Sequence, residues 1–200
     1  MRILLQTDNL DISVAGRCLV KQLSLQVNAG SLVCVLGTNG AGKTLTLHTL
    51  AGLRPSRKGA IRICGEALSA LPRIEIARRL GLLLQIHDDA FPMTVLDSAL
   101  MGRFPRLGFW QWAGKADREI ALAAMSRFDL AGLEDRAVTT LSGGERERVA
   151  LATLMVQDPE IWLLDEPMNH LDPHHQIAVM EELAATANRG RSVITTLHNP

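Results

Sequence analysis

A glycine-rich stretch at residues 37–44 carries the residue types and spacing of a phosphate-binding loop. It reads Gly-Thr-Asn-Gly-Ala-Gly-Lys-Thr and follows an apolar run at 32–36, which predicts a buried strand, a tight turn and a helix starting near residue 42. Glycines let the backbone turn its N–H groups inward onto one anion. The lysine would reach the β- and γ-phosphates, and the threonine hydroxyl can ligate Mg²⁺. The pattern predicts a site for a nucleoside triphosphate. The alternative is a plain glycine-rich turn. The residues of the predicted site are Gly37, Asn39, Gly40, Ala41, Gly42, Lys43 and Thr44.

Two adjacent carboxylates, Asp165 and Glu166, follow a second apolar run at 161–164. Carboxylates at the end of a buried strand are costly unless a cation or a water molecule uses them. Asp165 suits the binding of Mg²⁺, and Glu166, which should point to a different side, suits the activation of water. The alternative is an acidic turn before Pro167.

Backbone donors and a hydroxyl converge again at residues 141–145, Leu-Ser-Gly-Gly-Glu, just before a helix expected over 146–157. Gln85 and His198 each follow an expected strand, 80–84 and 192–197, where open α/β sheets bind ligands. Gln85 could equally be a solvated amide. His198 could hydrogen-bond a γ-phosphate, although a single histidine at a strand end is more often only exposed.

The elements around these residues fall into two groups. Strand-like runs at 3–5, 10–14 and 23–27, with a short hairpin at 59–65, indicate an antiparallel sheet beside the phosphate loop. Apolar residues at helical spacing between 86 and 140 indicate a helical insertion. Helices are also expected at 43–53 and 72–79.

Four aromatic residues gather inside the helical insertion, which is unusual for a chain with so few of them. Either the loop is packed by its own side chains or it forms a docking surface for a partner. The four are Phe104, Phe109, Trp110 and Trp112. Farther along, His174 and His175 are not expected to share a metal ion, because neighbours on a helix face different directions.

The composition is that of an ordinary globular protein, with 47% hydrophobic and 21% charged residues in 200. The chain has 21 basic residues (Lys and Arg) and 21 acidic residues (Asp and Glu), so it has no net positive charge to attract nucleic acid. Nucleic acid is therefore not expected as a partner. The sequence has no apolar run of membrane-spanning length and no leader, which predicts a cytoplasmic protein. The three cysteines, Cys18, Cys34 and Cys64, are expected to be reduced core thiols.

Taken together, the phosphate loop, Leu-Ser-Gly-Gly-Glu at 141–145 and Ile-Trp-Leu-Leu-Asp-Glu-Pro at 161–167 resemble an ATP-binding-cassette (ABC) ATPase over the whole chain. The resemblance implies an α/β P-loop NTPase with a mostly parallel core sheet. It further implies a single nucleotide-binding domain over 1–200, with an antiparallel β subdomain at about 1–35 and 58–66 and a helical subdomain at about 86–140.

The resemblance also assigns roles to the site residues, with ATP and Mg²⁺ as cofactors. Thr44, Gln85 and Asp165 would contact the metal ion. Glu166 would polarise the attacking water, and His198 would contact the γ-phosphate. Residues 169–172, ending at Asp172, would form the D-loop. The γ-phosphate held by a second subunit would be bound by Ser142, Gly143 and Gly144, so that two cassettes meet head to tail as a homodimer.

Three stretches are similar to importer cassettes for iron-siderophores, haem and cobalamin: residues 91–95, 101–105 and 169–172. By this resemblance the chain would lie at the cytoplasmic face of the cell membrane as a peripheral protein. Its helical insertion would receive a transmembrane permease, which a substrate-binding protein supplies. An ATP-driven clamp on DNA or the ribosome is an alternative from another class, and an exporter cassette differs only in its partner.

Two features depart from the family pattern. Val14 stands where an aromatic residue usually stacks on adenine, so adenine selectivity is expected to be weaker. The chain also ends two residues after His198, whereas the family continues through further strands and helices. This predicts an exposed edge at the last strand, which would be a liability for stability.

Overall fold

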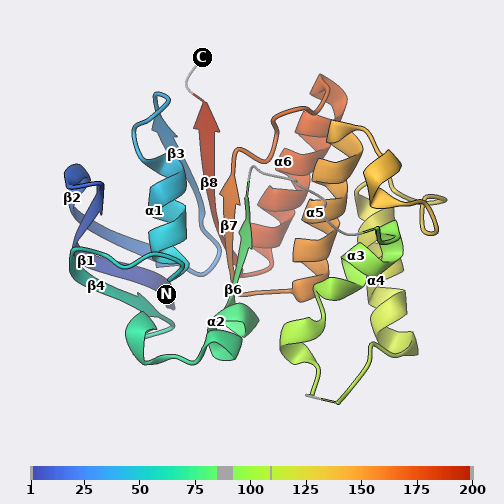
Figure 1. Ribbon diagram of the computed structural model, residues 1–200, viewed down its shortest axis with the longest axis horizontal. Helices are drawn as coiled ribbons and strands as arrows, with labels where there is room; N and C mark the ends of the chain where they lie inside the picture. Colours follow the sequence, from blue (N-terminus) through green and yellow to red (C-terminus); the bar gives the residue numbers. More distant parts are fainter. Residues whose placement is uncertain (1, 85–91, 109, 199–200) are drawn as a thin grey trace.

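A parallel four-stranded sheet forms the centre of the computed structural model, which describes residues 2–84, 92–108 and 110–198 (Figure 1). Its strands are β3 (Leu32–Gly37), β6 (Leu80–Leu83), β7 (Ile161–Asp165) and β8 (Ser192–His198), in the order β3-β8-β7-β6. The strands are parallel at every pairing, so their carboxyl ends meet at one edge. The predicted α/β class with a parallel core sheet is confirmed.

A second, antiparallel sheet contains β1 (Ile3–Val14), β2 (Arg17–Asn28), β4 (Lys58–Ile63) and β5 (Glu66–Ala67), in the order β2-β1-β4-β5. The runs at 3–5 and 10–14 were expected as separate strands, but both belong to β1. The register against β2 shifts between Thr7 and Leu10, and Asn9 between them has a φ of 45°. The strand therefore continues through a β-bulge at polar residues whose sequence is typical of a turn.

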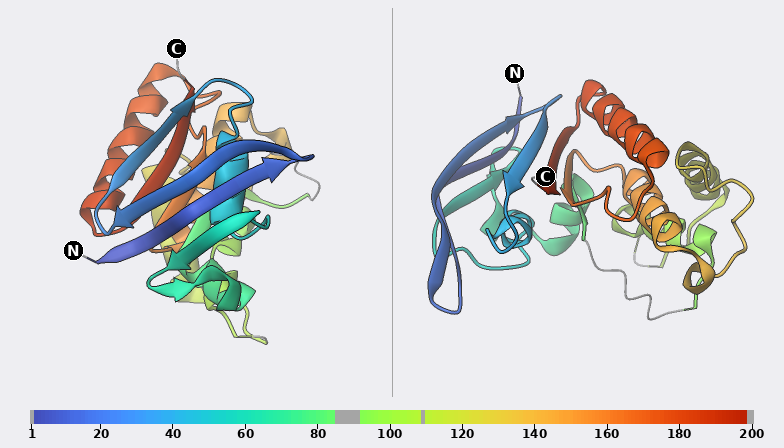
Figure 2. Two further views of the ribbon diagram at one scale, coloured as in Figure 1. Left: turned by 90° about the vertical axis from the view of Figure 1, so that its left-hand side faces the viewer. Right: turned by 90° about the horizontal axis from the view of Figure 1, so that it is seen from above.

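The antiparallel sheet ends before residue 32, earlier than the expected limit near 35. β3 pairs with β8 and so belongs to the parallel sheet. Helix α1 (Lys43–Leu50) lies between the two sheets (Figure 2, right), and its Leu47 and Leu50 share one apolar cluster with Leu4 of β1 and Leu163 of β7. This cluster fixes the helix that follows the phosphate loop against the core.

Helices α5 (Gly143–Gln157) and α6 (Pro173–Asn188) cover the opposite face of the parallel sheet, and α3 (Val95–Met101) and α4 (Lys115–Arg127) pack on α5 from outside. Shorter helical elements are α2 (Arg73–Arg79) and the 3₁₀ turns η1 (Leu68–Ala70), η2 (Phe104–Arg106) and η3 (Val138–Thr140). β7 alternates between the two faces: Ile161 and Leu163 pack on the α1 side, and Trp162 and Leu164 on the α5 and α6 side. None of the helices within the described ranges has the length and apolar content needed to cross a membrane.

The last strand is not an edge. β8 lies between β3 and β7 and pairs with both, so the predicted exposed edge at this strand is wrong. The crossover through α6 returns the chain to the centre of the sheet, which puts β3 and β6 at the margins of the described sheet. Cys34, on the margin strand β3, is exposed and not the core thiol that was expected; Cys18 and Cys64 are half-buried, and all three are free.

Candidate nucleotide-binding site

The predicted phosphate loop joins β3 to α1. Gly40 and Gly42 have φ values of 78° and 95°, which glycine adopts without the strain that a side chain would bring. A Cβ atom on Gly42 would also lie 3.3 Å from the Cβ of Leu19. The loop and the start of α1 line a cavity of about 400 Å³, to which Glu166, the residue after β7, also contributes. The other lining residues are Thr38, Asn39, Gly40, Gly42, Lys43, Thr44 and Leu45. Gly37 and Ala41 are not among the lining residues.

Lys43 lines this cavity and is buried. Its Nζ donates a hydrogen bond to the Gly37 carbonyl at 2.7 Å and forms an ion pair with Glu166 Oε1 at 3.5 Å. The ammonium is therefore held by acceptors with which a phosphate oxygen would compete. The same contact shows that the fold brings the loop lysine and the carboxylate, 123 positions apart in the sequence, to one point.

Asp165 and Glu166 lie at the carboxyl end of β7 and are almost fully buried, 1% and 7% exposed. The Thr196 hydroxyl donates to Asp165 Oδ1 at 2.6 Å and accepts from the Glu166 backbone N–H at 2.9 Å. Glu166 Oε2 accepts from Asn169 Nδ2 at 2.8 Å. The side chains thus have different partners, as the sequence suggested for two neighbouring acids with separate roles.

One observation indicates that the oxygen atoms of this site suit a magnesium ion. Asp165 Oδ2 is buried and has no hydrogen-bond partner among the described residues, and an unsatisfied buried carboxylate oxygen is costly. A hard oxygen-binding cation would satisfy it. Thr44 lines the neighbouring cavity and offers a hydroxyl. Gln85, the third predicted metal contact, lies outside the described residues.

His198 is described only by its backbone. It is the last residue of β8 and pairs in register with Gly37, so the fold places it beside the start of the phosphate loop. This is the strand end at which the sequence placed a γ-phosphate contact. Its predicted role stays a prediction.

The stretch 141–145 forms the N-terminus of α5, away from the phosphate loop. Ser142 and Glu145 make a capping box: the Ser142 hydroxyl accepts from the Glu145 N–H, and the Glu145 carboxylate accepts from the Ser142 N–H at 2.7 Å. This backbone hydrogen bond is the main cause that lowers the pKa of Glu145. A Cβ atom on Gly144 would lie 3.0 Å from the His170 carbonyl, so the close approach of the two segments favours glycine there.

A second cavity of about 440 Å³ opens at this helix start. It is lined by Ser142, Gly143, Gly144, Glu145, Arg148, His170, Leu171, Asp172 and His175. The fold therefore joins two stretches that the sequence singled out separately. Among the described residues, none lines both this cavity and the one at the phosphate loop.

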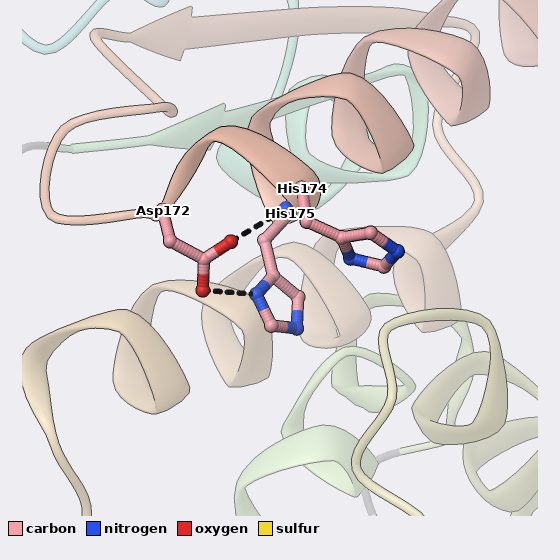
Figure 3. Close-up of side chains that lie close together, drawn as sticks. All are labelled: Asp172, His174 and His175. Atoms are coloured by element: carbon pink, nitrogen blue, oxygen red, sulfur yellow. Dashed lines mark hydrogen bonds and ion pairs between the residues drawn. The ribbon is translucent and has the colours of Figure 1, made fainter.

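Asp172 caps the N-terminus of α6 beside His174 and His175 (Figure 3). One carboxylate oxygen accepts from the His175 backbone N–H at 3.0 Å and the other lies 2.8 Å from His175 Nδ1; the first bond is the main cause that lowers the pKa of Asp172. One potential ligand atom from each of the three side chains lies within 4.8 Å of the others, so the expectation that the adjacent histidines diverge is too strict. Both carboxylate oxygens are already engaged, and the positive end of the helix disfavours a cation.

The aromatic residues of the helical region are not packed by their own loop. Trp110 and Trp112 are each 89% exposed and Phe104 is 57% exposed, whereas Phe109 lies outside the described residues. With Ile74, Arg78, Leu107, Gly108 and Gln111 they line a third cavity of about 680 Å³. Exposed tryptophans around a cavity favour the docking alternative.

Thr196 is a polar residue beside the two acids that was not singled out in the sequence. Thr196 lies inside an apolar-looking strand, and its contact with Asp165 depends on the register of β8 against β7. The only signal available was a hydroxyl residue within a run otherwise suited to a buried strand.

Comparisons with known proteins agree with this geometry. The family model described as ABC transporter matches residues 20–169. A hemin import ATP-binding protein of Gloeobacter violaceus is 38% identical over 98% of this chain and 73% of its own length. A manganese transport system ATP-binding protein of Bacillus subtilis is 33% identical over 97% of this chain and 76% of its own length. A solved structure described as an inward-facing conformation of a metal-chelate type ABC transporter has a TM-score of 0.84 at 29% identity, covering 100% of this chain and 75% of that one.

Proposed function

Because the chain belongs to the ABC transporter family, we propose that it is the ATP-hydrolysing subunit that powers import through a membrane permease. The observation that carries this proposal is the cavity in which Lys43 of the phosphate loop meets Glu166. We further propose that residues 1–200 act as one nucleotide-binding domain, with an antiparallel β subdomain at about 1–31 and 58–66 and a helical subdomain at about 86–140.

The residues of the site have separate roles in the proposed hydrolysis of ATP. The loop N–H groups and Lys43 bind the β- and γ-phosphates of ATP. Glu166 accepts a proton from the attacking water, and Asn169, which donates to its Oε2, holds the carboxylate in place. Thr44, Asp165 and Gln85 would hold Mg²⁺, which neutralises negative charge on the phosphates when it is bound. His198 would donate a hydrogen bond to the γ-phosphate.

The separation of the two cavities supports a composite site. The residues at the start of α5, Ser142, Gly143 and Gly144, line a cavity other than that of the phosphate loop. In a head-to-tail homodimer each phosphate loop would face the α5 start of the second subunit, where unpaired helix N–H groups and Ser142 would contact the γ-phosphate. Asp172, in the same cavity, would lie in this dimer interface.

Mixing two inactive variants tests the composite site. A Lys43→Ala chain keeps its α5 start, and a Ser142→Arg chain keeps its phosphate loop, so a dimer of one of each would contain one complete site. We expect each variant alone to be inactive and an equal mixture to recover about a quarter of wild-type ATP hydrolysis, because half of the dimers are mixed and each carries one of two sites. Phosphate release after co-refolding or co-expression measures this. Activity that stays at the level of the separate variants would contradict a shared site.

The permease is expected to dock on the exposed aromatic cavity lined by Phe104, Trp110 and Trp112. Aromatic side chains supply much of the binding energy at protein interfaces, and these are already exposed. The chain would then be peripheral, at the cytoplasmic face of the membrane. Relatives named for hemin and manganese support a haem or metal cargo, which a substrate-binding protein would bring to the permease.

Co-purification from membranes tests the docking surface. We expect the double variant Trp110→Ala, Trp112→Ala to lose most of its membrane-bound fraction, because removal of an aromatic anchor costs about 2 kcal/mol or more. ATP binding should persist, since neither residue lines the phosphate cavity. Ile177→Ala is the matched control, because Ile177 is also a large exposed apolar residue, 62% exposed, on α6. Equal retention of both variants on the membrane would count against this surface.

A further inference from the structure

We propose that Thr196 is a positioning residue that sets both acids of the hydrolytic site through one hydroxyl. The inference rests on the proposed function and adds a residue that acts through the two acids. Thr196 Oγ1 donates to Asp165 Oδ1 at 2.6 Å and accepts from the Glu166 N–H at 2.9 Å. A single side chain on β8 thus connects to the expected metal ligand and to the backbone of the expected base on β7.

The geometry of the sheet makes this contact stable. Asp165 and Thr196 are register partners in the parallel pairing of β7 with β8. Thr196 is fully buried and β-branched, so its χ1 rotamer is restricted and its hydroxyl does not exchange its partners for water. Buried hydrogen bonds of this kind specify one arrangement more strongly than exposed ones.

For Asp165, the hydroxyl determines which oxygen remains for a cation. Oδ1 is occupied by the short bond from Thr196, whereas Oδ2 is buried and has no partner in the described part of the chain. The carboxylate is therefore oriented with one oxygen satisfied by the protein and one left for Mg²⁺. Loss of the hydroxyl would leave both oxygens unsatisfied and would free the carboxylate to rotate.

For Glu166, the hydroxyl supports an unusual backbone conformation. Its φ of 54° lies in the left-handed region, which costs free energy for a residue with a side chain. The N–H bond to Thr196 helps to hold the residue in this conformation, from which its carboxylate reaches the cavity of Lys43. Without that acceptor the Glu166 N–H group would lose this buried hydrogen bond.

The neighbouring residue offers a control with the same chemistry. Thr195 is also fully buried, but side chains alternate along a strand. Val193 packs in the cluster with α5 and α6, and Ile194 in the cluster with α1, so Thr195 shares the face of Val193 and Thr196 that of Ile194. Thr195 Oγ1 donates to the Thr196 carbonyl at 3.4 Å, which is a long and weak bond.

The experiment compares Thr196→Val, Thr196→Ser and Thr195→Val with the wild-type chain. Valine keeps the volume and branching of threonine without the hydroxyl, and serine keeps the hydroxyl. Two readouts are used: the affinity for a fluorescent ATP analogue in EDTA and in Mg²⁺, and the rate of ATP hydrolysis against Mg²⁺ concentration. Thermal unfolding without nucleotide reports purely structural damage.

We expect Thr196→Val to require about tenfold more Mg²⁺ for half-maximal activity and to lose about tenfold in kcat, with unchanged affinity for the analogue in EDTA. Thr196→Ser should restore both, and Thr195→Val should resemble wild type. The proposal fails if Thr196→Val keeps the wild-type Mg²⁺ dependence, if serine does not rescue, or if Thr195→Val shows the same shift. A wild-type chain that binds the analogue without hydrolysing it would contradict the proposed function, and the Mg²⁺ effect on binding would still decide the role of Thr196.

Discussion

Replacement of Glu166 by glutamine is expected to lower kcat for ATP hydrolysis by about 10²–10⁴, because a general base contributes this much and an amide cannot accept the proton from water. The substitution preserves size and leaves an amide oxygen that can still accept from Asn169 Nδ2. The fold around the carboxylate, which is 7% exposed, should therefore persist. Steady-state phosphate release measures the loss.

Binding of ATP should survive this substitution or become tighter. Glu166 Oε1 now pairs with Lys43 Nζ at 3.5 Å, and a neutral amide would compete less with the phosphates for the ammonium. Titration with a fluorescent ATP analogue checks this. Glu181→Gln makes the same chemical change on the exposed side of α6 and should alter neither quantity. Turnover within about threefold of wild type in Glu166→Gln would exclude Glu166 as the base.

Replacement of Lys43 by alanine is expected to weaken ATP binding itself by about 10- to 100-fold, because charge-assisted hydrogen bonds contribute about 1.5–3 kcal/mol each. Lys43 lines the phosphate cavity and is buried, so its charge is little screened by water. The substitution also leaves the Glu166 carboxylate without its cation. Both effects lower the affinity of the cavity for the negatively charged triphosphate.

Equilibrium titration with the ATP analogue measures the change, and Lys115→Ala serves as the control. Lys115 starts α4 and is exposed, so its removal changes the net charge equally without touching the cavity. Wild-type affinity in Lys43→Ala would remove the phosphate loop assignment. An equal loss in Lys115→Ala would indicate a general charge effect instead.

Local pattern predicted the elements that carry the motifs. The helix after the loop, the helix before β6, the buried run at β7 and the helix after Ser142 all form near their expected positions. These predictions worked because apolar periodicity, glycine and capping residues act over a few positions. The bulge at Asn9 was missed, since polar residues in a paired strand look like a turn when the partner strand is unknown.

Strand order could not be obtained in the same way. The sequence led to an expected edge at the last strand, whereas β8 lies between β3 and β7. Hydrophobic runs show that a strand is buried but not which strands are its neighbours. The role of Thr196 was missed for the same reason, because its partners Asp165 and Glu166, at the end of β7, lie 31 and 30 positions away in the sequence.

The sequence by itself determined the chemistry of the loop and the acidic pair, because glycine spacing, one lysine and two carboxylates at a strand end are local requirements of phosphate binding and hydrolysis. Only the tertiary structure decided that Lys43 and Glu166 share a cavity and that Ser142 and Asp172 share a different one. The physical reason is that packing of α1 between two sheets and the parallel register of β7 with β8 set these distances. Such contacts join residues far apart in the chain, and their geometry comes from the whole core.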